Sequence, residues 1–60
     1  MTAADVSALA HHLFETKGAK AIAEAAHKAV IFETAGDEPQ AKLWRSVEAV
    51  LREMRGPKES

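Results

Sequence analysis

The stretch GDEPQAKLWRSVEAVLREMRGP, residues 36–57, decides the fold because it carries a helix start, an apolar face and a helix stop. Asp37 can cap the free backbone N–H groups of the first helical turn, and Gln40, three residues later, completes a capping box. Pro39 suits that first turn, because its missing N–H loses no hydrogen bond there. Together these residues predict that a helix begins at residue 38.

Apolar residues recur through this helix at steps of three and four, which places them on one face. The predicted face consists of Gln40, Leu43, Trp44, Val47, Val50, Leu51 and Met54. The opposite side carries Ala41, Arg45, Ala49 and Arg52, bordered by Lys42, Glu48 and Arg55. Gly56 and Pro57 end the helix, since glycine accepts a left-handed cap and proline cannot continue a helix. We therefore predict a helix over residues 38–55 whose apolar face is buried and whose opposite side lies in solvent.

The 60 residues form at most one domain, which we assign to residues 1–56. A chain this short buries only about 60% of its unfolded surface, so its core is marginal without a disulfide, a metal or a partner. The chain has no cysteine, which excludes disulfides and thiolate zinc sites. Association into a homo-oligomer, with a dimer favoured, is the most economical support that remains.

The net charge of −1 gives no electrostatic argument for a nucleic-acid partner or an anionic membrane. No apolar run approaches the roughly 18–20 residues of a membrane span, and the N-terminus lacks the pattern of a signal peptide. We expect a soluble, cytoplasmic protein with no membrane or nucleic-acid partner. The tail at residues 57–60 is expected to be disordered.

A first helix is predicted over residues 3–16, opened by a second capping box from Thr2 to Asp5. Its apolar face consists of Val6, Leu9, Ala10, Leu13 and Phe14. Gly18 ends this helix if it adopts the left-handed cap conformation, which we favour over a kinked continuation into the next segment.

A second helix is predicted over residues 19–35, ending at Gly36. Its apolar face is formed by Ile22, Ala25, Ala26, Ala29 and Phe32 and is widened by Ala19, Ala23 and Val30. A face this wide suits a central helix that contacts two neighbours. The link at residues 36–38 is so short that the second and third helices must be antiparallel. We predict an all-α fold of three helices, either up-down-up or a helical hairpin with the N-terminal helix packed across it.

Ile31 does not fit this face, because it projects roughly opposite Ile22. With Val30 and Phe32 it surrounds the end of the second helix with apolar surface, more than one neighbouring helix can cover. Trp44 is expected to be partly buried at a seam between helices or subunits. We interpret Val30, Ile31, Phe32 and Trp44 as interaction residues of a self-associating protein, while a lone exposed isoleucine is the simpler alternative.

A further set of residues resembles a known pattern: Gly18, Gly36-Asp37, Ala41, Trp44, Val47 and Leu51. The pattern is similar to that of a family of short, uncharacterised bacterial helical proteins, in which a Gly-Asp turn precedes a helix carrying a tryptophan. The resemblance covers about the last two thirds of the chain. It implies a helical fold and adds no catalytic residue, because that family has no assigned activity.

Glu24-Ala25-Ala26-His27 is the one motif with a mechanism attached, since Glu-x-x-His places a carboxylate and an imidazole on one helix face, as in di-iron bundles. Two chains could combine two such pairs with two copies of Glu15 into a site for iron, manganese or zinc. Against this hypothesis, Lys28 follows Glu24 at i+4 and can pair with it. His11 and His12 are interpreted as surface histidines.

Other chemistries find no support in the sequence. Ser7 and Ser46 have no evident base, and the glycines mark helix ends rather than a phosphate loop. Arg45, Arg52, Arg55 and Lys58 form a basic stripe, but acidic residues interrupt it. We therefore expect a small non-enzymatic interaction or regulatory module that self-associates, with a metal-binding bundle and a weak nucleic-acid binder acting through the third helix as alternatives.

Overall fold

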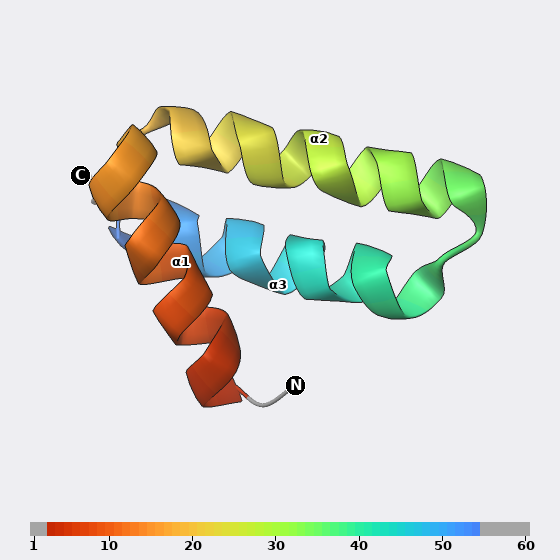
Figure 1. Ribbon diagram of the computed structural model, residues 1–60, viewed down its shortest axis with the longest axis horizontal. Coiled ribbons are helices and arrows are strands. Elements are labelled where there is room, and N and C mark those ends of the chain that lie inside the picture. Colours follow the sequence, from red (N-terminus) through yellow and green to blue (C-terminus); the bar gives the residue numbers. More distant parts are fainter. Residues whose placement is uncertain (1–2, 55–60) are drawn as a thin grey trace.

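The structure, a computed structural model, describes residues 3–54 as three α-helices (Figure 1). They are α1 (Ala3–Lys17), α2 (Lys20–Ala35) and α3 (Glu38–Met54). Their ends differ from the predicted limits by at most one residue. The predicted cap at Thr2, the helix stop at residues 56–57 and the tail at residues 57–60 lie outside the described residues.

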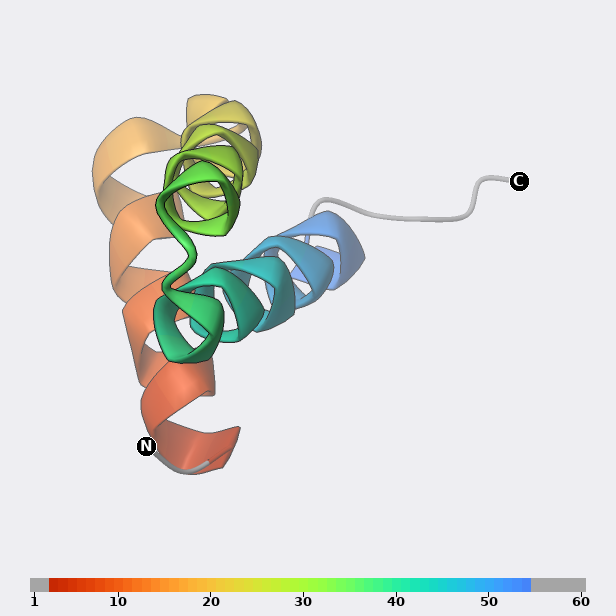
Figure 2. The ribbon, with the colours of Figure 1, turned by 90° about the vertical axis from the view of Figure 1, so that its right-hand side faces the viewer.

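The three helices form an antiparallel hairpin with the first helix packed across it. α2 and α3 lie side by side and run in opposite directions, and α1 crosses the hairpin obliquely (Figure 1). The view along the hairpin shows α1 on one side of it (Figure 2). α3 packs most extensively against α2 and next against α1, whereas α1 and α2 touch each other less. The fold is therefore all-α, and of the two predicted arrangements the hairpin with an N-terminal helix describes it.

Gly18 separates α1 from α2, as favoured by the sequence. Its φ of 64° lies in the left-handed region, and its N–H donates to the carbonyl of Phe14 at 2.8 Å. This single bond caps the end of α1 in the manner of glycine-terminated helices. The Gly18 carbonyl then accepts a hydrogen bond from the Ala21 N–H at 3.0 Å, so the turn leads directly into α2.

Gly36, with a φ of 79°, ends α2 in a Schellman motif. Its N–H donates to the carbonyl of Glu33 at 3.2 Å, and the Asp37 N–H donates to the carbonyl of Phe32 at 2.9 Å. Asp37 then caps α3, because its side-chain Oδ1 accepts a hydrogen bond from the Gln40 N–H at 3.4 Å. Two residues thus stop one helix and start the next, which forces the antiparallel hairpin.

The core lies where α1, α2 and the C-terminal half of α3 meet. Its fully buried members are Ala10, Ala21, Ala25, Val47 and Leu51. The apolar side chains packed around them are only partly buried: Val6, Leu9, Leu13, Phe14, Ile22, Leu43, Trp44, Val50 and Met54. Of the fully buried residues in the described chain, only Leu51 and Val47 have large side chains. The core is therefore small and rich in alanine.

α2 contacts both other helices, as predicted, but it is not the central helix of the fold, because α1 packs mainly against α3 and α3 therefore makes the more extensive contacts. The buried face of α2 is a narrow stripe of Ala21, Ala25 and Ala29, spaced four residues apart. Ala19 and Ala23, which were expected to widen the buried face, are exposed, and so is Val30. The small side chains of this alanine stripe let α3 approach α2 closely. The opposite side of α2 stays in solvent.

The buried arc on α3 is correspondingly wider than predicted. Ala41 and Glu48, placed at the solvent side by the sequence pattern, are buried, whereas Gln40 is exposed. Val47 and Leu51 are buried as predicted, and Leu43, Trp44, Val50 and Met54 are partly buried. An arc of this width follows from contact with two helices, since each neighbour covers a different part of the α3 surface.

Candidate interaction surface

The outer face of α2 is the side of this helix that is turned away from α3. It consists of Lys20, Ala23, His27, Val30, Ile31 and Thr34, which follow one another at steps of one, three or four residues and are all exposed. Steps of three and four bring residues to the same side of a helix. Within residues 4–54 the exposed large hydrophobic side chains are Val30 and Ile31, which are 50% and 48% exposed. Both lie toward the C-terminal end of this face.

The structure does not bring the four predicted interaction residues into one surface. Val30 and Ile31 share the outer face of α2. Phe32 is partly buried and follows Ala25 and Ala29 on the side that meets α3. Trp44 is partly buried against the core, as expected, and the Lys28 ammonium lies 5.4 Å from the centre of its ring. Only the first two residues therefore remain available to a partner on this face.

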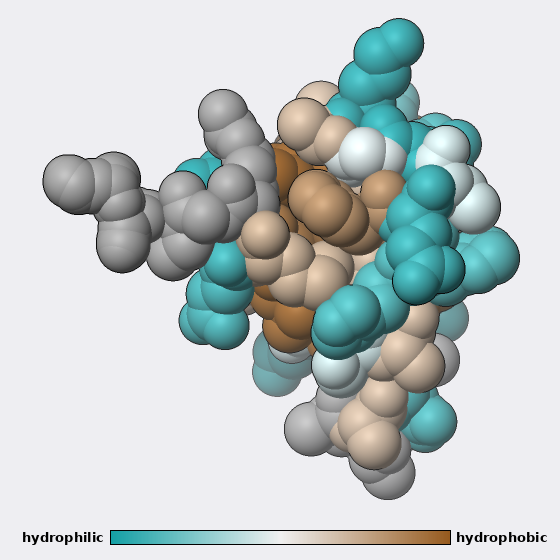
Figure 3. All heavy atoms as spheres, turned by 90° about the vertical axis from the view of Figure 1, so that its left-hand side faces the viewer, coloured by the Kyte–Doolittle hydropathy of each residue, from teal (hydrophilic) through white to brown (hydrophobic). Residues whose placement is uncertain are grey.

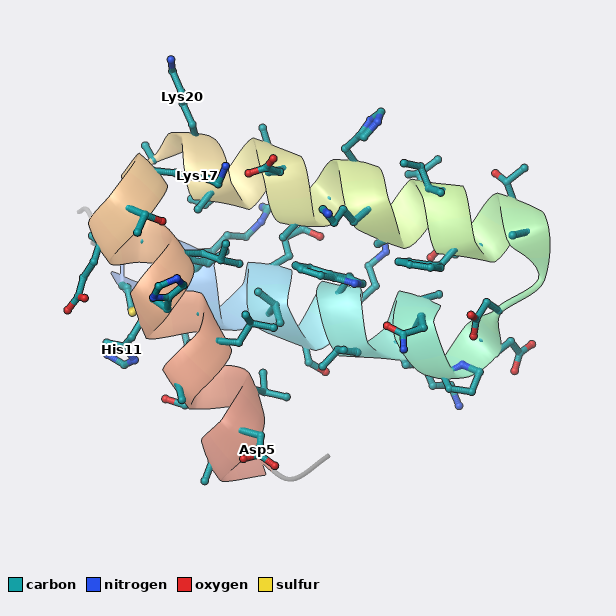
Figure 4. All side chains as sticks on the ribbon, viewed as in Figure 1. Asp5, His11, Lys17 and Lys20 are labelled. Carbon is teal, nitrogen blue, oxygen red and sulfur yellow. The ribbon has the colours of Figure 1, made fainter. Side chains whose placement is uncertain are left out.

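A shallow hollow lies at the opposite end of the same face, in the corner between α1 and α2. Its volume is about 720 Å³, and it is lined by Thr16, Lys17, Lys20, Ala23, Glu24 and His27. Lys17 reaches from the end of α1 toward α2, whereas Lys20 extends away from the start of α2 (Figure 4). The outer face of α2 thus has an apolar projection at one end and a depression at the other.

An ion pair fixes one wall of this hollow. Lys17 Nζ lies 2.9 Å from Glu24 Oε1 and so joins α1 to α2 across the Gly18 turn. The hydrogen bond from Lys17 lowers the pKa of the Glu24 carboxyl below its ordinary value, against a smaller opposing effect of desolvation. The predicted pairing of Glu24 with Lys28 is therefore wrong: Lys17 is the ion-pair partner, and Lys28 lies over the Trp44 ring instead.

The candidate metal ligands are only partly brought together. Glu24 and His27 both line the hollow, but Glu15 is exposed on α1 and is not part of its lining. Among residues 3–54, no group of three or more His, Cys, Asp or Glu side chains is arranged to hold a metal ion. On α1, His11 Nδ1 lies 2.9 Å from the Ser7 carbonyl oxygen, one turn earlier (Figure 4). Within residues 3–54, Glu24 and His27 are therefore the two predicted ligands that lie together in the hollow.

A chain of ion pairs joins α2 to α3 on another side of the hairpin. Arg45 donates to both carboxylate oxygens of Glu33, from Nε at 3.1 Å and from Nη2 at 3.2 Å. It also donates from Nη1 to Glu48 at 3.2 Å. Arg52 donates to Glu48 from Nη2 at 2.8 Å and from Nε at 3.2 Å. The two arginines are thereby matched by two carboxylates.

Glu48, only 8% exposed, is the buried charged residue of this network. Burial is the largest single effect and by itself would raise the pKa of its carboxyl, but the hydrogen bonds from Arg52 and Arg45 and the positive charges of these side chains together outweigh burial and lower that pKa. The same contacts, led by the one from Glu33, raise the pKa of Arg45. The i,i+4 spacing of Glu48 and Arg52 suits such an ion pair, but the sequence pattern placed Glu48 on the solvent side of the helix.

This network bears on the basic stripe noted in the sequence. Of its four members, Arg45 and Arg52 lie in the described part of the chain, and both are engaged by carboxylates. Nucleic-acid binding depends on cations that are free to neutralise phosphates. These two arginines therefore do not form a free phosphate-binding surface.

Comparison with protein-family models, with curated proteins and with solved structures found no match for this chain. Over residues 3–54, no helix combines the length and the apolar character that crossing a membrane requires. The geometry of the molecular surface is accordingly the basis on which a function can be proposed.

Proposed function

We propose that the protein is a small, non-enzymatic helical interaction module that associates with a second copy of itself. The observation that carries this proposal is the incomplete core. Apart from Leu51 and Val47, the large apolar side chains of residues 4–54 that reach the core are only partly buried. Figure 3 shows apolar side chains open at the surface, with hydrophilic side chains around them, at the end where α1 passes into α2. Apolar surface that stays in contact with water favours association.

The size of the chain supports the same conclusion. Domains of about 60 residues are marginal as monomers, and this chain has no disulfide to supplement its core. A stable interface buries about 600–1,000 Å² on each partner. Against an accessible surface of 4014 Å², that is roughly 15–25% of the molecule.

The experiment is sedimentation of the purified full chain from low micromolar to millimolar concentration. The expected result is a reversible shift from about one to about two chain masses as the concentration rises. A constant monomer mass throughout this range, with helical circular dichroism retained, would refute self-association. It would leave a separate partner protein as the remaining form of the interaction hypothesis.

A metal-binding bundle is the second candidate, because Glu24 and His27 lie together in one hollow. A second copy of the chain would have to complete the ligand set, since a carboxylate and an imidazole from one chain make a weak site. The test is metal analysis of protein purified without chelator, beside Glu24→Ala and His27→Ala. This candidate is supported if the natural protein contains stoichiometric iron, manganese or zinc and each substitution abolishes metal binding. It is refuted if the protein is purified without metal and does not bind added metal.

A further inference from the structure

The charges of α2 oppose its own helix dipole. A helix is stabilised by acidic side chains in its first turn and basic side chains in its last turn. The first turn of α2 contains no acidic residue and begins with Lys20, and its last turn contains no basic residue and carries Glu33. Lys20 makes no ion pair within the described residues. The N-terminal end of α2 is therefore doubly positive. At its C-terminal end Glu33 is already paired with Arg45, so the negative character there comes from the last carbonyl groups of the helix.

The shape of the outer face is likewise different at its two ends. Val30 and Ile31 project near the C-terminal end, and the hollow beside Lys20 lies near the N-terminal end. Lys20 and Ile31 are 11 residues apart, which corresponds to roughly 16 Å along a helix. Between them the face carries the small side chain of Ala23 and the flat ring of His27. A second helix can approach closely at such a position.

These two asymmetries complement each other when a second copy is turned end for end. A two-fold axis at the level of Ala25 places residue i of one copy opposite residue 50 − i of the other. Val30 then faces the partner's Lys20, and Ala23 faces the partner's His27. Each apolar projection meets the other copy's hollow, and the Lys20 end of each α2 lies toward the C-terminal carbonyl groups of the other α2. Two-fold interfaces require self-complementarity of this kind.

We propose that two copies pair through the outer faces of α2, antiparallel across a two-fold axis, so that Val30 and Ile31 of each copy enter the hollow beside Lys20 of the other. This inference rests on the proposed self-association and specifies its surface. The alkyl stem of Lys20 covers the partner's apolar side chains, while its ammonium lies toward the last carbonyl groups of the partner's α2. The result is a four-helix layer in which α3, α2 and their two counterparts lie side by side.

Cysteine cross-linking tests the register directly, because the natural chain contains no cysteine. Lys20→Cys and Val30→Cys are made as separate single variants. In the proposed pairing, two copies of either variant place their thiols about 10 residues apart along the helices, roughly 15 Å, which exceeds the reach of a disulfide. Mixing the two variants brings the thiols opposite each other. The expected result is a disulfide-linked dimer from the oxidised mixture, formed at least tenfold faster than from either variant alone.

Substitution at the projection tests its contribution. Ile31→Lys is expected to raise the dimer dissociation constant at least about tenfold, because it places a charge where apolar surface is covered. Ala49→Lys is the matched control, since Ala49 is exposed on α3 and lies outside this face. Both substitutions are at exposed positions, and helical circular dichroism verifies that each variant folds.

The outcomes separate this inference from the proposal on which it rests. A natural chain that stays monomeric overturns both. Suppose instead that the natural chain dimerises, that Ile31→Lys weakens the dimer no more than Ala49→Lys does, and that the mixed cysteine variants do not cross-link. This result overturns only the α2 interface and places the contact elsewhere, for example at the apolar end shown in Figure 3. Selective cross-linking of the mixture together with selective weakening by Ile31→Lys supports the inference.

Discussion

Glu48 is the residue at which the structure makes its sharpest prediction about stability. Glu48→Gln keeps the size of the side chain and removes the negative charge that accepts three hydrogen bonds from Arg45 and Arg52. Hydrogen bonds to charged groups contribute about 1.5–3 kcal/mol when they are protected from water. Here the arginine side chains are 46% and 67% exposed, which brings the interaction close to that of exposed ion pairs, about 0.2–1 kcal/mol each. We expect a loss of about 1 kcal/mol, or a melting temperature lower by roughly 4–8 °C.

The effect of Glu48→Gln on stability should depend on pH in a defined direction. Because the pKa of Glu48 is lowered in the folded protein, its carboxylate contributes its full stabilisation above the ordinary pKa of 4.5. That contribution is lost as the pH falls below 4.5 through the lowered folded-state value. The difference in unfolding free energy between the natural chain and Glu48→Gln should therefore be largest near neutral pH and should shrink in acid.

The assay is urea unfolding, followed by circular dichroism from pH 3 to pH 8 at one fixed protein concentration, so that self-association contributes equally to each variant. Glu53→Gln is the control, because Glu53 is an exposed carboxylate on the same helix and makes no ion pair among residues 3–54. The reasoning is refuted if Glu48→Gln and Glu53→Gln have equal stabilities at every pH.

Three further substitutions test the turn, the core and the tryptophan contact. Gly36→Ala should lower the free energy of unfolding by about 1–2 kcal/mol through the left-handed φ alone, since an added Cβ meets no other atom within 4 Å. A synthetic chain with D-alanine at this position should recover the lost stability. Leu51→Ala should cost about 2–5 kcal/mol, a large part of the roughly 3–9 kcal/mol expected for a chain of this size, and should leave little helical signal at modest urea concentrations. Lys28→Met should lower stability by about 0.5–1 kcal/mol by removing the ammonium above Trp44, a loss that Lys42→Met at an exposed site should not reproduce.

The sequence was sufficient to predict the three helices because their limits are set by local interactions. The left-handed glycine at Gly36 and the Asp37 cap act within a few residues, and the periodicity of the third helix indicates most of its buried face. The short link then requires an antiparallel hairpin, whatever the rest of the chain does. The same local reasoning identified Ile31 as exposed and Trp44 as partly buried.

The candidate surface was predicted less completely. The sequence named Val30 and Ile31, but it grouped them with Phe32 and Trp44, which the structure places on other sides of the hairpin. The hollow in the corner between α1 and α2 depends on the direction in which the chain leaves Gly18, and no pattern in the sequence specifies that direction. The end-for-end complementarity of α2 could therefore not be derived from the sequence.

By itself, the sequence determined where each helix begins and ends and which residues are apolar enough to be buried. Only the tertiary structure decided which helix is central. Alanine is compatible with either environment, so the eight residues expected to form a wide buried face on α2 could not show which side meets α3. Which side of α2 is buried depends on where α1 packs, and α1 packs mainly on α3. Ala21 and Glu48 are therefore buried, while Ala23 and Val30 lie in solvent.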